Sequence, residues 1–223
     1  MKSELSMSLE NLGCNQSRKP VVVGITGGSG SGKTTFAKRL LAWFGADAIM
    51  LSHDDYYKNR PDMTTEEAAV YDFDCPEAFD TALLVKHLSD LKDGQSVAVP
   101  SYDFTTHARV DAVRVVEPAP VVLVEGLLIM CDPELLGMFD LVIYMDADAD
   151  TKALRRIERD CRERGADLPR ALNMYFGIAK PAYEKYIEPF KPQADIILSD
   201  ALNDRSLEVV ARGIKGFFND ARN

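Results

Sequence analysis

The sequence predicts an α/β fold in which a mainly parallel β-sheet carries helices on both faces. Short apolar, often β-branched runs alternate along the chain with longer segments of helical periodicity, an order typical of parallel sheets. The length of 223 residues suits one such domain with an insertion or a lid. A composition of 46% hydrophobic and 27% charged residues supports an ordinary globular core.

The elements are expected in alternating order along most of the chain. Buried strands are predicted at residues 21–25, 48–51, 121–124, 141–144 and 194–198. Helices are predicted at residues 34–44, 80–92, 151–164 and 206–218. Val97 and Val99 alternate with other residues, as do Val113 and Val115, which indicates a small antiparallel pair.

We expect one domain over residues 19–223, preceded by a polar and flexible tail at residues 1–18. Within the domain, residues 95–118 are expected to form a β-hairpin insertion. Residues 151–186 are expected to form a helical lid, rich in arginine at its start. No internal repeat is evident, so a repeat architecture is excluded.

Charge and cysteine content limit the partners. The net charge of −9 argues against nucleic acid, because phosphate backbones need a basic surface. No apolar run reaches membrane-spanning length, so no membrane partner is expected. The four cysteines are far apart, which favours reduced thiols in a cytoplasmic protein over a disulfide or a metal site.

Residues 27–34 match the phosphate-binding pattern G-x-x-x-x-G-K-[ST], with a predicted strand before it and a predicted helix after it. Glycines let backbone N–H groups approach phosphate oxygens closely, Lys33 adds a charge, and the Thr34 hydroxyl can bind Mg²⁺. The alternative, a Gly/Ser linker, does not explain this context. The fold is therefore predicted to be of the P-loop NTPase type. The residues expected to bind the nucleotide are Gly27, Gly28, Ser29, Gly30, Ser31, Gly32, Lys33, Thr34 and Thr35.

Carboxylates follow several predicted strands, where ligands bind in such folds. Asp54 or Asp55 can orient an acceptor hydroxyl and help to hold Mg²⁺, although a polar turn also explains this pair. Glu125 can hold a metal-bound water, and Asp146 competes for that role. A P-loop with such groups predicts transfer to an acceptor, whereas a P-loop alone is compatible with a switch protein.

Five arginines crowd residues 155–164, and Arg155, Arg159 and Arg162 share one helical face. That face can clamp a transferring phosphoryl group, as a lid would. The alternative is a solvated helix with Arg–Glu pairs. Since an acidic chain must gather positive charge locally to bind a polyanion, the clamp is favoured. The loop at 100–107 mixes aromatic and polar side chains, so it can stack on a planar ring or form an ordinary hairpin end.

Taken together, these segments resemble the uridine kinases of the P-loop phosphoribulokinase/uridine kinase family over about residues 20–200. The resemblance is carried by Asp54 to Lys58, Phe73 to Asp80, Tyr102 to Phe104 with His107, Glu125 to Leu128, and Arg155 to Gly165, besides the P-loop. It implies a kinase that phosphorylates the 5′-hydroxyl of uridine or cytidine with ATP or GTP and Mg²⁺. It also implies a homo-oligomer.

Roles carried over from the resemblance are assigned position by position. They make Asp54 the catalytic base and, with Thr34 and Glu125, a metal partner. Lys33, Arg159 and Arg164 would meet phosphates, and Asp74 would hold the ribose hydroxyls. The remaining substrate contacts implied are Tyr57, Tyr102, Phe104, His107 and Arg156.

The sequence also departs from the family pattern. Ala166 stands where the family usually has arginine, and Met174 where it usually has glutamine. Both positions are on the substrate side, so base discrimination is expected to weaken while phosphoryl transfer survives. A milder departure is Asn203 in place of aspartate. Two alternatives therefore stay open: a related kinase with another hydroxyl acceptor, and a nucleotide-binding switch protein.

Overall fold

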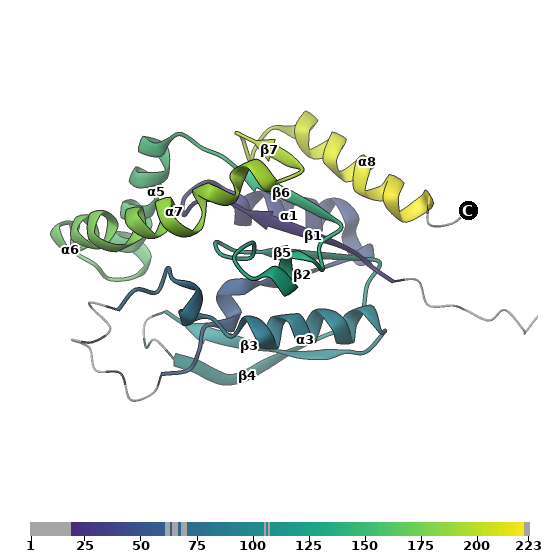
Figure 1. Ribbon diagram of the computed structural model, residues 1–223, viewed down its shortest axis with the longest axis horizontal. Coiled ribbons are helices and arrows are strands. Elements are labelled where there is room, and N and C mark those ends of the chain that lie inside the picture. The colour runs from purple at the N-terminus through teal and green to yellow at the C-terminus, as the bar shows by residue number, and fades with distance from the viewer. Residues whose placement is uncertain are drawn as a thin grey trace, which may run out of the picture.

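Five short apolar runs form one parallel sheet in the order β2-β5-β1-β6-β7 (Figure 1). The computed structural model describes residues 19–60, 63, 67, 71–104, 106 and 108–220, so the expected tail at 1–18 lies outside the described residues. All four strand pairs run parallel. The strands are β1 (Val21–Thr26), β2 (Ala48–Ser52), β5 (Val121–Glu125), β6 (Leu141–Met145) and β7 (Ile196–Leu198).

Helices cover the sheet on both faces, as Figure 1 shows. The α-helices are α1 (Lys33–Phe44), α3 (Thr81–Lys92), α4 (Pro133–Leu136), α5 (Ala149–Glu163), α6 (Leu168–Met174), α7 (Lys180–Tyr186) and α8 (Asp204–Asp220). Short 3-10 segments are η1 (Gly45–Asp47), η2 (His53–Tyr56), η3 (Pro76–Ala78) and η5 (Glu188–Gln193), and η4 (Tyr175–Ala179) is a π-helical turn. None of the helices among the described residues is long and apolar enough to cross a membrane.

Alternation along the strands produces two separate cores. On β1, Val22 packs with α3, while Val23 and Ile25 pack against α1 and α8. On β5, Val122 and Leu123 divide in the same way, and both are fully buried. Strands that are buried on both faces explain why each of these runs is almost continuously apolar.

A two-stranded antiparallel sheet of β3 (Val97–Asp103) and β4 (Ala108–Val116) forms the predicted hairpin. Val97, Val99 and Val116 are buried against α3 and the sheet. Val113 and Val115 on β4 are 60% and 64% exposed. The hairpin is therefore anchored by one end and one face, and its far end lies beside the segments that follow β2.

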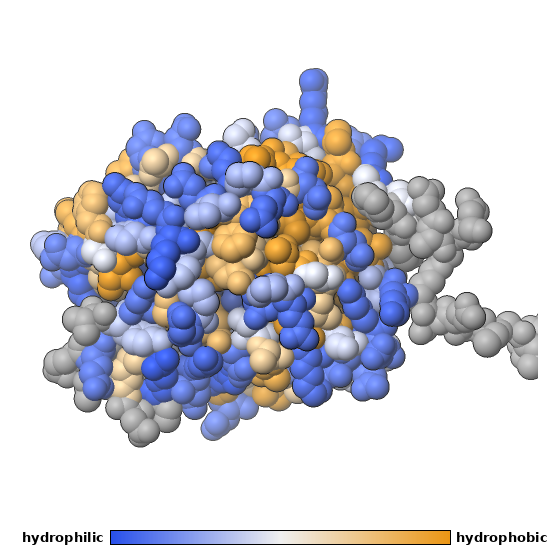
Figure 2. All heavy atoms as spheres, in the orientation of Figure 1, coloured by the Kyte–Doolittle hydropathy of each residue, from blue (hydrophilic) through white to orange (hydrophobic). Residues whose placement is uncertain are grey.

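The surface is mixed in polarity. On the face drawn in Figure 2, hydrophilic side chains dominate the lower half, where α3 and the hairpin lie, and apolar ones are more frequent higher up, toward β7 and α8. The exposed apolar residues include Ile197 on β7, Leu202 in the loop that follows it and Val209 on α8. Scattered exposed apolar residues of this kind are normal for a globular protein.

The predicted fold class is confirmed, and the predicted strands and helices correspond to observed ones. One difference concerns the lid. Residues 168–186 form a nearly continuous helical run, α6–η4–α7, which sequence periodicity did not reveal. The reason is Pro169 and Pro181, because proline in a sequence usually predicts a loop. In the structure both prolines lie in the first turn of a helix, where proline is tolerated.

The sheet order gathers four strand ends at one edge. The loop after β1 leads into α1, η2 follows β2, and Glu125 and Met145 end β5 and β6. Since all strands run parallel, these carboxyl ends meet on one side, where helices α5, α6 and α7 also approach (Figure 1). The candidate site lies along this edge.

We expect Leu123→Ala to lower the free energy of unfolding by roughly 2–5 kcal/mol, because it empties volume in the fully buried centre of the sheet. Urea unfolding followed by circular dichroism measures this. Val209→Ala, at a position 71% exposed on α8, is the control and should change stability by no more than about 0.5 kcal/mol. Equal losses from the two variants would contradict the assignment of the core.

Candidate active site

The loop between β1 and α1 has a backbone that only glycine adopts easily. Gly27, Gly30 and Gly32 have φ angles of 138°, 81° and 92°. A Cβ atom on Gly27 would lie 2.3 Å from the Met145 carbonyl oxygen, and one on Gly30 would lie 2.6 Å from that of Lys152. The loop is thus fitted tightly between β6 and α5, with its N–H groups next to the start of α1.

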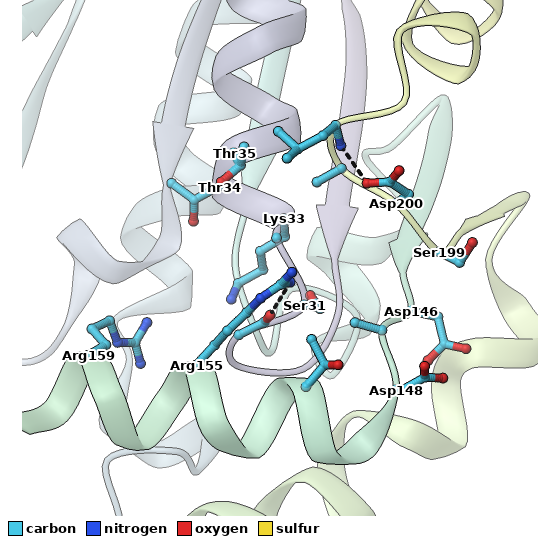
Figure 3. A pocket seen from close by; sticks show the side chains of 16 residues that line it. Ser31, Lys33, Thr34, Thr35, Asp146, Asp148, Arg155, Arg159, Ser199 and Asp200 are labelled. Carbon is cyan, nitrogen blue, oxygen red and sulfur yellow. Dashed lines mark hydrogen bonds between the residues drawn. The ribbon is translucent and has the colours of Figure 1, made fainter.

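A cavity of about 660 Å³ opens in front of this loop (Figure 3). Lys33 reaches into it from the start of α1, and Arg155 and Arg159 reach toward it from α5. Arg155 donates a hydrogen bond to the Gly30 carbonyl at 3.2 Å, and Arg159 donates one to Ser29 Oγ at 2.9 Å. The residues that line the cavity are 30–35, 146–148, 151, 155, 159 and 199–202.

Positive charge in this cavity is incompletely neutralised. Burial lowers the pKa of Lys33, even though Glu125 and Asp54 act against the shift. Burial also lowers the pKa of Arg159, with further contributions from Arg164 and Arg156. Within the described part of the chain, the buried Nε of Arg159 and Oγ of Ser31 have no hydrogen-bond partner. Such a group of cations and unpaired donors suits a polyanion.

Asp54 lies on η2, directly after β2, and faces this positive charge. Removal from water raises its pKa, with a further increase from Glu125, while Lys33, Arg164 and Arg159 act in the opposite direction. Its Oδ1 atom is buried and has no hydrogen-bond partner among the described residues. Asp55 instead lies 3.8 Å from Arg114 on the hairpin. Of the two aspartates considered in the sequence, Asp54 is therefore the one beside the cavity cations.

Glu125, at the end of β5, is almost fully buried and tied to the loop. Its Oε2 accepts a hydrogen bond from the Thr34 hydroxyl at 3.0 Å, and its Oε1 accepts one from the Ser52 hydroxyl at 2.8 Å. Asp146 lines the cavity in front of the P-loop but pairs with Lys191 at 2.6 Å and lies 4.0 Å from Lys152. Asp146 is thus neutralised by lysines, whereas Glu125 interacts with the hydroxyl of the P-loop threonine.

A second, smaller cavity of about 80 Å³ adjoins the lid on the side of the hairpin. Tyr57, Asp74, Phe104 and Arg156, all expected from the sequence to contact substrate, line it together. It is also lined by Tyr71, Phe73, Asp160, Arg164, Ala166, Arg170, Met174 and Ile178. Aromatic rings on one side and paired charges on the other make a suitable enclosure for a planar ring carrying a polar group.

A buried ion network fixes the polar side of this second cavity. Arg156 donates to Asp160 at 2.7 Å and to Asp74 at 3.2 Å, and all three residues are buried. Burial acts against the charge of Arg156, but Asp74 and Asp160 raise its pKa above the ordinary value. Asp160 also accepts a bond from Arg164 at 3.3 Å. Asp74 is therefore held in position by a guanidinium that is itself held by Asp160.

Some expected residues lie elsewhere than the sequence suggested. Arg164 stacks over the Phe104 ring at 4.6 Å and lines the second cavity, not the one in front of the P-loop. The Tyr102 ring packs 4.9 Å from that of Tyr57 and does not line either cavity. The prediction that Arg162 belongs to the clamp is wrong, because its side chain is 76% exposed and pairs with Glu158. His107 lies outside the described residues.

Sequence reasoning missed Asp160, Ser52 and Tyr71 as members of the site. Asp160 had a usable signal, since it lies four residues after Arg156 and four before Arg164 on one helix. Ser52 ends β2 beside Glu125, its parallel partner on β5, which only the strand pairing reveals. Tyr71 had no signal that separates it from an ordinary surface tyrosine.

The protein-family model described as Phosphoribulokinase / Uridine kinase family matches residues 22–205. A uridine kinase of Clostridium perfringens is 40% identical over 200 residues, covering 89% of this chain and 96% of that protein. A uridine kinase of Ligilactobacillus salivarius is 44% identical over 187 residues, covering 83% and 88%.

Solved structures share the fold at low identity. Phosphoribulokinase from Rhodobacter spheroides superposes with a TM-score of 0.59 at 20% identity, covering 83% of this chain and 73% of that one. D-glycerate 3-kinase from Cryptococcus neoformans gives a TM-score of 0.54 at 18% identity, covering 74% and 78%. These two likenesses concern the fold alone.

We expect Asp54→Asn to increase the free energy of unfolding at neutral pH in the absence of nucleotide and divalent cations. The unfolded chain ionises Asp54 near pH 4, whereas the folded chain retains the proton to higher pH. The natural chain therefore loses stability relative to the variant as pH rises from about 4 toward the raised pKa. Urea titrations at pH 4 to 8 measure the difference, and a gap that shrinks with rising pH would contradict it.

Proposed function

The chain belongs to the phosphoribulokinase/uridine kinase family, and we propose from this premise that it transfers a phosphoryl group from ATP or GTP to the 5′-hydroxyl of uridine or cytidine. The observation that carries the proposal is the position of Asp54. It interacts electrostatically with Lys33 and Arg159, which line the first cavity, and with Arg164, which lines the second. A donor in one cavity and an acceptor in the other would meet at this carboxylate.

In this proposal, the P-loop backbone and Lys33 hold the terminal phosphates of the donor, and Arg159 neutralises charge that develops during transfer. Asp54 accepts a hydrogen bond from the acceptor hydroxyl and takes its proton as the oxygen attacks the terminal phosphorus. The unpartnered Oδ1 of Asp54 supports this role, because it leaves an acceptor atom available to the incoming hydroxyl. The bond between that phosphorus and the bridging oxygen of the donor breaks, leaving a nucleoside diphosphate.

A magnesium ion fits the residues beside the proposed position of the donor phosphates. The structure describes no cluster of three or more His, Cys, Asp or Glu side chains that could hold a metal by themselves. Mg²⁺ characteristically uses one or two protein groups and completes its shell with phosphates and water. Thr34, Asp54 and Glu125 provide such groups, and Mg²⁺ bound there would reduce the repulsion between the donor phosphates and the acceptor oxygen.

The second cavity supports a nucleoside as acceptor. Asp74, fixed by Arg156, can accept hydrogen bonds from the two ribose hydroxyls. Tyr57 and Phe104 can enclose the base, with Tyr102 packed behind Tyr57. We keep His107 as a proposed base contact from the family resemblance. A switch protein would need neither this enclosure nor the acceptor-facing carboxylate, so the kinase is preferred.

A related kinase with a differently substituted acceptor is the second candidate. Ala166 and Met174, the two departures from the family pattern, both line the acceptor cavity. A methyl group makes no hydrogen bond and a thioether is only a weak acceptor, so neither side chain gives the edge of a pyrimidine a strong partner. We therefore propose that this enzyme discriminates between bases less strictly than a site with polar groups at these positions.

Two further proposals concern the compartment and the oligomeric state. The three described cysteines, Cys75, Cys131 and Cys161, are unpaired, in keeping with a reducing cytoplasm. We also propose a homo-oligomer, as the resemblance implies, with the exposed Val113 and Val115 of β4 as candidate contacts. Nucleic acid and membrane are not proposed as partners.

Asp54→Asn should lower nucleoside-dependent release of ADP by at least about 100-fold, the scale of general-base catalysis, while ATP binding persists. Asp55→Asn is the matched control, because Asp55 faces Arg114 and should leave the rate within a few-fold. A coupled assay with uridine and cytidine measures the rates, and calorimetry measures ATP affinity. Full activity of the Asp54 variant would refute its assignment as the base.

The double variant Ala166→Arg, Met174→Gln should increase the preference for uridine and cytidine over 5-substituted pyrimidine nucleosides by about tenfold in kcat/KM. The added groups give the base edge hydrogen-bonding partners and reduce free space, and one well-made contact of this kind is worth about 1.4 kcal/mol. Competition assays with paired acceptors report the ratio. An unchanged ratio would mean that these two positions do not face the base.

A further inference from the structure

Arg109 of β4 joins the hairpin to the segment that carries Tyr57. Its Nε donates to the Tyr57 carbonyl at 2.8 Å, and its terminal nitrogen donates to Asp80 Oδ2 at 3.1 Å. The Arg109 backbone N–H also donates to the Asn59 side chain at 3.3 Å. One residue of the hairpin therefore makes three hydrogen bonds to two segments outside it.

Strand register connects Arg109 to the aromatic side of the acceptor cavity. Tyr102 on β3 is the direct antiparallel partner of Arg109, so both side chains project from the same face of the hairpin. The Tyr102 ring lies 4.9 Å from the ring of Tyr57, the residue whose carbonyl accepts from Arg109. Phe104 continues this group, with its ring 5.3 Å from that of Tyr102 and 5.8 Å from that of Tyr57.

The other end of the Arg109 contact is rigid. Asp80 is the N-cap of α3, where its Oδ1 accepts from the Leu83 N–H at 3.3 Å while Oδ2 faces Arg109. The Asp80 N–H donates to the Tyr56 carbonyl at 2.8 Å, and the Lys58 N–H donates to the Ala78 carbonyl at 2.8 Å. The segment with Asp54 and Tyr57 is thus joined to α3, and Arg109 binds at this junction.

The contact is suited to holding a position. The Arg109 side chain is 23% exposed, and its planar guanidinium uses two different nitrogens for two acceptors, which fixes orientation as well as distance. Arg114, on the same strand, is 51% exposed, lies as far as 3.8 Å from Asp55 and donates one hydrogen bond, to the Met50 carbonyl at 3.3 Å. A loose exposed pair of that kind contributes little, so the two arginines form a natural comparison.

We propose that Arg109 is a positioning residue for the acceptor: it holds the end of the hairpin, and with it Tyr102 and Phe104, against Tyr57 so that the aromatic side of the nucleoside cavity is formed before substrate arrives. This role rests on the proposed function in one respect, namely that the acceptor is a nucleoside. Arg109 itself touches neither cavity, and it acts through Tyr57 and the hairpin.

The test compares Arg109→Ala, Arg109→Lys and Arg114→Ala in the full chain. Arg109→Ala should raise the KM for nucleoside about tenfold, which corresponds to about 1.4 kcal/mol, while the KM for ATP changes less than about twofold. Arg109→Lys should recover part of the loss, because an ammonium can satisfy one acceptor but not both. Arg114→Ala should resemble the natural chain in both KM values.

Hydrogen exchange of the hairpin amides provides a readout that does not depend on substrate. Residues 97–104 should exchange faster in Arg109→Ala than in Arg114→Ala, with the same urea midpoint for both variants. Equal exchange in the two variants, or an equal rise in the KM for ATP and nucleoside, overturns the proposal. If the natural chain phosphorylates no nucleoside, the proposed function fails, and the exchange comparison still decides whether Arg109 holds the hairpin.

Discussion

The structure depends on a cluster of buried charged groups that are only partly paired with one another. Lys33, Asp54 and Glu125 approach one another at the carboxyl edge of the sheet. Removing each of these groups from water costs free energy. Two apolar cores, one on each face of the sheet, provide the stability that lets the edge retain these groups. A polyanionic ligand with a divalent cation would complete the electrostatic balance that the protein alone leaves unfinished.

Arginines of one helix, α5, serve both cavities, but in different ways. Arg155 and Arg159 of α5 face the P-loop, and the buried Nε of Arg159 has no hydrogen-bond partner among the described residues. Arg156 and Arg164, by contrast, both donate hydrogen bonds to Asp160, and Arg164 also stacks on the ring of Phe104. Arginine therefore serves here both as an available anion partner and as an internal brace: Arg159 lies 3.8 Å from Asp160 without a hydrogen bond to it, whereas Arg156 and Arg164 donate hydrogen bonds to that carboxylate.

The sequence predicted the fold and the phosphate loop well because both rest on local patterns. Apolar runs interrupted by amphipathic helices define the sheet, and the glycine spacing from Gly27 to Gly32 is itself the backbone geometry. Residue pattern alone does not separate Asp54 from Asp55, since both follow the same strand; the family resemblance selects Asp54, and the structure places Asp55 beside Arg114 while Asp54 keeps an unpartnered Oδ1. The prediction that Arg162 belongs to the phosphate clamp is wrong for a related reason. Helical spacing gives the angular position of Arg162, but not how far along α5 the P-loop extends, and Arg162 pairs with Glu158 instead.

The shared carboxylate of Asp80 also has a consequence for how the chain acquires its structure. Its bond to Leu83 spans three residues and can form as soon as α3 does, whereas its bond to Arg109 must close a loop of 29 residues. We therefore expect α3 to be in place before the hairpin docks against it, so that the base-enclosing side forms only on a helix that is already capped.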